Sequence, residues 1–68
     1  MEKLQKLRIE KKLSYNDMSK LLNISKTFYW QIENNKRRLS YLMAIKISDI
    51  FNLKPDEIFY EEYKNLEI

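Results

Sequence analysis

Three side chains that can hydrogen-bond to the edges of DNA bases lie close together in residues 26–34. Lys26 can donate to N7 and O6 of guanine, and Gln31 can pair with adenine through two hydrogen bonds. Thr27 offers both a hydroxyl and a methyl group to thymine. A surface that presents all three has the chemistry to read base pairs in the major groove.

The residue types that the sequence lacks exclude much other chemistry. Histidine and cysteine are absent, which removes the commonest general base, the imidazole and thiolate ligands of metal sites, and disulfides. No effector pocket can be recognised in the sequence. We therefore expect no enzyme, no cofactor, no metal site and no small-molecule effector.

The sequence also carries no sign of a membrane protein. No apolar run approaches the roughly 20 residues that a membrane span requires, and the N-terminal residues lack the apolar core of a signal peptide. We expect a cytoplasmic protein without a membrane partner.

Positive charge is concentrated in the first part of the chain. The net charge of +3 divides into eleven Lys or Arg against four Asp or Glu in residues 1–48, and two against six in residues 49–68. A basic surface attracts nucleic acid phosphates or anionic lipid, whereas the acidic end would be repelled by both. An ordinary solvated charged face would give the same counts, so charge alone leaves both interpretations open.

The candidate base-reading side chains need a helix to hold them, and the pattern predicts five short helices in an all-α fold. Ser14, Ser25 and Ser40 each precede an apolar stripe at helical spacing, as N-cap residues do. Pro55 fits the first turn of a helix, where no amide donor is required. The expected helices span residues 2–12, 15–22 and 26–34, a longer segment after residue 40, and a short segment from residue 55.

The sequence contains no glycine, which is the usual residue at left-handed helix ends. Asn23, Asn35 and Asn52 each follow an apolar stripe by a residue or two, and asparagine tolerates positive φ better than most other residues. We therefore expect these asparagines to end helices. With 68 residues and no linker or repeat, the chain should form one compact unit with a thin stability margin.

Only residues 23–25 connect the second expected helix to the third. Two helices joined by so short a turn cross steeply and approach closely, which requires a small residue facing the turn and apolar residues on the inner faces. Ser19 is the small residue. The apolar residues are Met18, Ile24, Tyr29 and Ile32.

The motif Ile32-Glu33-Asn34-Asn35-Lys36, which follows a capped helix, is the most specific of several in the sequence. The others are Leu4-x-x-Leu7-Arg8, Leu13-Ser14, Leu21-Leu22-Asn23-Ile24-Ser25, Ala44-Ile45-Lys46-Ile47 and Asp56-Glu57-Ile58-Phe59. Together these motifs resemble the phage-repressor-like helix-turn-helix regulators, called the XRE or Cro-like family, over about residues 4–59. The resemblance implies a bundle of five short helices, with a DNA-binding domain at residues 1–59 and a tail at residues 60–68.

The resemblance also implies roles for individual residues. The helix at 26–34 would enter the major groove, where Lys26, Thr27 and Gln31 reach base edges, while the helix at 15–22 lies across the DNA backbone. Phosphate contacts are implied for Tyr15, Asn34, Lys36, Arg37 and Arg38. Tyr15 stands where the family commonly has glutamine, and the three loop cations would also suit a simple role in solubility.

Arg8 and Glu33 match a pair that forms a partly buried salt bridge in the family, which implies a structural role for both. The sequence departs from the family at Lys12, where glycine is common, and at Leu39, where proline often stands.

Phe28 and Trp30 are further candidates for DNA contact. Phe28 lies between the exposed face and the core, where it could instead pack under the second helix. Trp30 lies on the outward face, where the family usually has a small residue. It either packs on sugars and thymine methyls or meets a partner subunit or another protein, because a tryptophan left fully in water is unfavourable.

Residues 60–68 are acidic and contain two tyrosines, and their pattern fits either a helix or a strand. Their acidity would keep them off DNA, so we assign them to self-association together with the end of the fourth or fifth helix. The candidate dimerisation residues are Phe51, Phe59, Tyr60, Tyr63 and Leu66.

Two functions from different classes follow from these expectations. The first is a sequence-specific transcriptional repressor that binds a near-palindromic operator in double-stranded DNA as a homodimer. The alternative is a protein-binding module of the same fold, such as an anti-repressor or an antitoxin. In such a module, Trp30 and the tyrosine-containing tail would bind another protein.

Overall fold

The computed structural model describes residues 1–64, which contain five helices and no strand. The helices are α1 (Glu2–Glu10), α2 (Tyr15–Leu22), α3 (Lys26–Glu33), α4 (Tyr41–Ile50) and α5 (Pro55–Lys64). The all-α fold expected from the sequence is confirmed. α1 ends two residues before its expected boundary, and α3 ends one residue before its own.

Serine residues cap the starts of α2, α3 and α4, as the sequence predicts. The Oγ atoms of Ser14, Ser25 and Ser40 accept hydrogen bonds of 3.0, 3.0 and 3.1 Å from the backbone nitrogen three residues later. Ser14 also donates its backbone N–H to the Asp17 carboxylate at 2.9 Å, which completes a capping box. This backbone hydrogen bond lowers the pKa of Asp17 from its ordinary value.

Within residues 1–64, the chain turns with positive φ at four residues, and none of them is glycine. The φ angle is 57° at Asn23, 59° at Asn35 and 56° at Asn52, so each asparagine lies in a left-handed turn at a helix end, as expected. Lys12 has a φ of 58° as well. Lysine lacks the short polar side chain with which asparagine stabilises this conformation, so the backbone is strained at Lys12.

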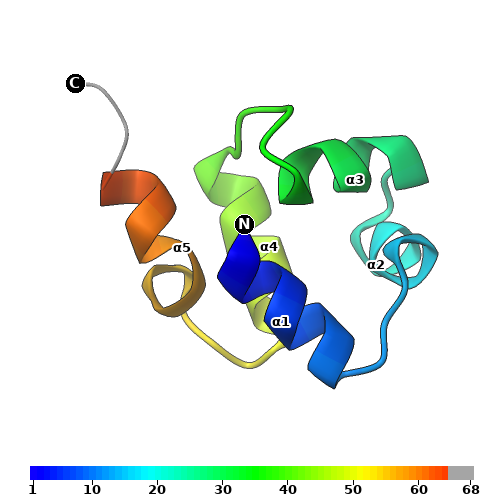
Figure 1. Cartoon of the computed structure of the whole chain (residues 1–68), viewed down its shortest axis with the longest axis horizontal. Helices are drawn as coiled ribbons and strands as arrows, with labels where there is room; N and C mark the ends of the chain where they lie inside the picture. The colour runs from blue at the N-terminus through cyan, green and yellow to red at the C-terminus, as the bar shows by residue number, and fades with distance from the viewer. Residues whose placement is uncertain (65–68) are drawn as a thin grey trace.

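The hydrophobic core lies among all five helices. Figure 1 shows α1 and α4 in the middle of the bundle, with α5 on one side and with α2 and α3 on the other. α5 packs on α1 and α4, and α2 packs on α3 and α4. The buried apolar residues are Leu4, Met18, Leu22, Tyr29, Ile32, Ala44, Ile47, Phe51, Ile58 and Phe59. Within residues 1–64, none of the helices has the length and apolar character needed to cross a membrane.

α5 continues through residue 59 without a break and ends at Lys64. Residues 60–64 are therefore helical, which decides between helix and strand for this part of the tail. Residues 65–68 lie outside the described residues.

A buried ion pair ties α1 to the end of α3. The Nε atom of Arg8 lies 3.0 and 3.1 Å from the two carboxylate oxygens of Glu33, and the two side chains are 10% and 3% exposed. Arg8 also donates to the carbonyl oxygen of Leu13 at 2.8 Å, and its guanidinium lies 4.4 Å from the ring centre of Tyr15. One arginine thus connects α1, the start of α2 and the end of α3.

Replacing Lys12 with glycine should stabilise the fold, because it removes a cost of about 1–2 kcal/mol for a left-handed residue with a β-carbon. Glycine also makes the unfolded chain more flexible, which lowers the free energy of unfolding by about 0.4–1 kcal/mol. We therefore expect a net increase of about 0.5–1 kcal/mol in the free energy of unfolding, measured by urea titration. Lys11→Gly is the matched control. Lys11 has a φ of −84°, so this change should cost about 0.5–1 kcal/mol. Equal shifts at both positions would contradict strain at Lys12.

Replacing Glu33 with alanine should lower the free energy of unfolding by about 3–5 kcal/mol, because it leaves the Arg8 guanidinium buried without its counter-charge. Denaturant titration measures the loss. Lys6→Ala serves as the control, since it breaks the exposed Lys6–Glu2 pair at 3.6 Å and should cost less than about 0.5 kcal/mol. A loss for Glu33→Ala as small as that for Lys6→Ala would mean that the buried pair does not anchor α3.

Candidate nucleic-acid interface

A tight turn sets the angle between α2 and α3. Asn23 has a left-handed conformation, and the backbone N–H of Ile24 donates to the carbonyl oxygen of Ser19 at 2.9 Å. Ser19 is buried, and its hydroxyl donates to the carbonyl oxygen of Asn16 at 2.7 Å. The small residue that the turn requires is therefore buried beside it, with its polar atom satisfied within α2.

α3 has one buried face and one exposed face. Tyr29 and Ile32 are buried in the core, and burial raises the pKa of the Tyr29 hydroxyl. Lys26 and Thr27 are exposed, whereas Gln31 is half-buried. Two of the three base-reading candidates therefore project into solvent from the first turn of α3, and the third lies at the edge of the exposed face.

Trp30 lies beside the first two of these candidates. Lys26, Thr27 and Trp30 border a shallow hollow of about 340 Å³ on the surface of α3. The Trp30 side chain is exposed, at 41% of its full accessible area. α3 therefore presents an aromatic surface next to two polar side chains that can contact bases.

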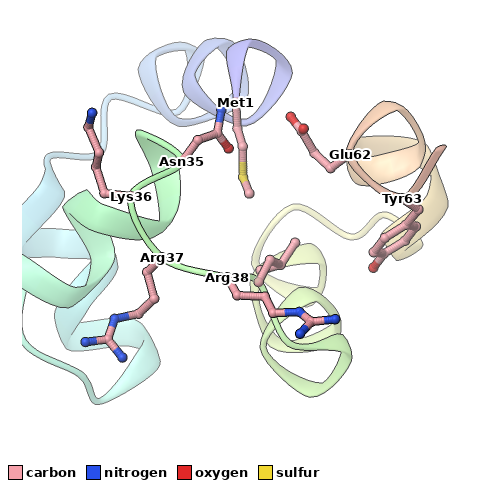
Figure 2. A pocket seen from close by; sticks show the side chains of 8 residues that line it. Met1, Asn35, Lys36, Arg37, Arg38, Glu62 and Tyr63 are labelled. Carbon is pink, nitrogen blue, oxygen red and sulfur yellow. The ribbon is translucent and has the colours of Figure 1, made fainter. Parts of the chain in front are cut away.

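The loop after α3 carries three consecutive cations. Figure 2 shows Lys36, Arg37 and Arg38 pointing in three different directions. Lys36 and Arg38 are exposed and make no side-chain hydrogen bond or ion pair within residues 1–64. Asn34, which precedes the loop, donates its side-chain amide to the carbonyl oxygen of Trp30 at 2.9 Å.

Arg37 differs from its neighbours because its side chain turns back onto α3. Its Nε atom donates to Oε1 of Gln31 at 3.2 Å, and its guanidinium carbon lies 4.5 Å from the ring centre of Phe28. Phe28 is half-buried and packs against the core. Sequence reasoning gave these three residues separate roles and missed their contact. Phe28 and Gln31 are three positions apart on α3, but no helical spacing links either of them to Arg37, which lies in the loop beyond the end of α3.

Tyr15, at the start of α2, is held within the fold by its ring. The ring centre lies 6.2 Å from that of Tyr29, and the Arg8 guanidinium packs over it. The side chain is half-buried, so a phosphate contact through its hydroxyl stays a prediction.

The candidate dimerisation residues separate into two groups. Phe51 and Phe59 are buried in the core of the five-helix bundle, so both side chains stabilise the fold itself. Tyr60 is exposed, and Tyr63 is half-buried. Leu66 lies outside the described residues. Tyr63 borders a hollow of about 320 Å³, which lies between the end of α5 and the loop after α3 (Figure 2).

Two large exposed side chains at the start of α4 were not singled out from the sequence. Tyr41 and Leu42 are 66% and 64% exposed. Tyr41 has the helical spacing of Ala44 and Ser48, which are both buried, so spacing alone would have placed it in the core. Its exposure depends on where the core ends along α4, and no sequence signal reports that.

Comparison with known proteins agrees with this geometry. A family model described as helix-turn-helix matches residues 4–58, which is most of the chain. No curated protein and no solved structure was found to match the sequence. The matched residues include the buried Arg8–Glu33 pair, the turn between α2 and α3, and the whole of α3. This protein therefore belongs to the XRE/Cro-like family of DNA-binding helix-turn-helix regulators.

Proposed function

We propose that this protein is a transcriptional repressor that binds a near-palindromic operator as a homodimer, with α3 in the major groove. The observation that carries the proposal is the division of α3 into two faces. Tyr29 and Glu33 are buried, while Lys26 and Thr27 are exposed. A helix that is anchored by one face and exposes base-contacting side chains on the other can enter a groove without disturbing the core.

Lys26, Thr27 and Gln31 are the proposed base-reading residues. Recognition helices contact bases mainly through their N-terminal residues, and these three belong to the first two turns of α3. Lys26 supplies donors for guanine, and Thr27 supplies a hydroxyl and a methyl group for thymine. Gln31 supplies an amide at the edge of the exposed face.

Phosphate contacts are proposed on both sides of α3. Lys36 and Arg38 are exposed, so they can bind phosphates without giving up a contact within the protein. Asn34 uses one of its two amide hydrogens on the Trp30 carbonyl and keeps the other for a phosphate. The Tyr15 hydroxyl would donate from the start of α2.

The chain divides into two functional parts under this proposal. Residues 1–59 supply the DNA-binding domain, and residues 60–68 supply the dimerisation element. The acidic side chains of residues 49–68 would be repelled by phosphates, which favours a position away from DNA for this end of the chain.

The proposed dimer surface combines the start of α4 with α5. Tyr60 on α5 is exposed, as are Tyr41 and Leu42 on α4. Tyr63 on α5 is half-buried, and burial raises the pKa of its hydroxyl. A dimer through this surface would cover large apolar side chains and present two copies of α3 to half-sites about one helical turn, roughly 34 Å, apart.

Repression is the simplest regulatory consequence of such binding. A protein that occupies a promoter blocks RNA polymerase by its presence alone, so repression requires only tight, selective binding.

A protein-binding module, such as an anti-repressor or an antitoxin, is the second candidate, and Trp30 favours it. An exposed tryptophan is a common anchor in protein–protein interfaces. Under this function, the exposed face of α3 would bind another protein, and DNA would be bound weakly and without sequence preference.

Selection of bound sequences from a random DNA pool distinguishes the two functions. A repressor should enrich a near-palindromic site, and its affinity for that site should fall steeply with salt because phosphate contacts release counterions. Fluorescence titration at two salt concentrations measures this dependence through Trp30, the single tryptophan. Micromolar or weaker binding without enrichment would favour the protein-binding module.

Alanine at Gln31 and alanine at Lys36 should have different effects on the selected site. Gln31→Ala should relax specificity at one base-pair position by about 1–3 kcal/mol, because it removes a base contact. Lys36→Ala should weaken binding to all sequences alike and reduce the salt slope by about one unit. Affinity measurements on cognate and random DNA test this difference. Equal effects of the two variants on both DNAs would contradict the assigned roles.

Trp30 should contact a thymine methyl group in the selected site. Replacing each thymine with uracil in turn should weaken binding at one position by about 0.8 kcal/mol, the value of one buried methyl group. In Trp30→Ala the same replacement should have no further effect. Thr27→Ser, which removes the other candidate methyl contact, is the matched control. If Trp30→Ala binds the operator as tightly as the wild type, Trp30 does not contact DNA.

A further inference from the structure

Arg37 lies where it can control how Gln31 meets DNA. Its Nε atom donates to Oε1 of Gln31 at 3.2 Å. Arginine has donors and no acceptor, so the amide atom that faces Arg37 must be the oxygen, and the amide nitrogen must face away from it. The contact therefore selects one of the two orientations of an amide whose ends could otherwise exchange by rotation.

Two further contacts hold this arrangement in place. The guanidinium of Arg37 lies 4.5 Å from the ring centre of Phe28, which itself packs against the core. Such a cation–π contact adds to the hydrogen bond. The backbone N–H of Lys36 also donates to the carbonyl oxygen of Gln31 at 2.7 Å. The backbone of the loop next to Arg37 is thus hydrogen-bonded to Gln31, the residue whose side chain Arg37 orients.

The orientation of Gln31 determines which base it can read. Glutamine recognises adenine by donating to N7 and accepting from N6, and the second of these bonds requires Oε1. Oε1 has a second lone pair, but the positive charge of Arg37 beside it disfavours a second donor such as the adenine amino group, whereas the Nε2 hydrogens of Gln31 stay available to acceptors. Guanine offers two acceptors, N7 and O6, to such donors. Adenine would instead place its N6 amino group near the positive charge of Arg37.

We propose that Arg37 is a positioning residue that makes Gln31 a reader of guanine rather than adenine. This inference rests on the proposed function, since it requires α3 to lie in the major groove. It separates Arg37 from Lys36 and Arg38, whose side chains point elsewhere from the same loop (Figure 2) and are assigned to phosphates.

Selection of bound sequences with variants of Gln31 and Arg37 tests the proposal. The position at which Gln31→Ala loses its base preference identifies the base pair that Gln31 contacts. The wild type should select guanine there, and Arg37→Ala should raise the ratio of adenine to guanine at that position by about tenfold. The double variant should match Gln31→Ala at this position, because Arg37 acts through Gln31.

Arg38→Ala is the matched control, because it removes a neighbouring cation that is assigned to a phosphate. It should weaken binding to all sequences alike and leave every base preference unchanged. The same uniform weakening by Arg37→Ala would overturn the proposal, and so would selection of adenine by the wild type at the Gln31 position. The absence of any enrichment by the wild type would reject the proposed function together with this inference.

A second measurement needs no DNA and detects the contact itself. In the ¹⁵N-labelled protein, the Nε–H of Arg37 should exchange with water several-fold more slowly than that of Arg38, because only Arg37 donates to a fixed acceptor. Gln31→Ala should remove the difference, while thermal melting verifies that the variant remains folded. Equal exchange rates of the two arginines in the wild type would show that Arg37 does not hold Gln31, and the proposal would fail.

Discussion

The orientation of α3 depends on the buried contact between Arg8 and Glu33. α3 has eight residues, which is too short for a helix to be stable by itself in water. Its position must therefore come from tertiary contacts. Tyr29 and Ile32 anchor it by burial, but apolar packing is not directional. The charge-assisted hydrogen bond that the Arg8 Nε–H shares between the two carboxylate oxygens of Glu33 is directional. Desolvation offsets much of the attraction in such a pair. We therefore expect its main effect to be a fixed orientation of α3, so that the exposed face keeps a constant angle to the rest of the bundle.

A chain without glycine must make its tight turns with other residues. Three of the four left-handed residues in the described part of the chain are asparagine, whose short polar side chain makes this conformation less costly than for other residues with a β-carbon. The fourth, Lys12, has no such compensation. The turn after α1 nevertheless keeps its form, because Arg8 holds the Leu13 carbonyl directly beyond it. The arginine that orients α3 through Glu33 thus also holds the residue that follows the strained turn.

Under our proposal, the three cations of the loop after α3 take different roles because their side chains leave the loop in different directions (Figure 2). Lys36 and Arg38 project from the loop and suit phosphates, which attract any exposed cation and carry no sequence information. Arg37 folds back over Phe28 onto Gln31. Under our proposal, its charge there determines which base Gln31 recognises. α5, which carries most of the acidic residues of the C-terminal part, lies on the opposite side of the bundle from α2 and α3 (Figure 1). The end of α5 nevertheless reaches the loop after α3, where Glu62 borders the same hollow as Lys36 and Arg38.

Local features of the fold could be predicted from the sequence alone. The serine caps, the asparagine turns and the five helices depend on residues within a few positions of one another, so their patterns are visible in the chain. The resemblance to a known family added the pairing of Arg8 with Glu33, which are 25 positions apart. Only the tertiary structure decided that Phe51 and Phe59 belong to the core, that Tyr41 is exposed, and that Arg37 contacts Gln31. The physical reason is the same in each case. Periodicity indicates which residues share a face of one helix. Whether that face is buried depends on where the neighbouring helices end. Which residue a loop side chain contacts depends on the path that the backbone takes after the helix.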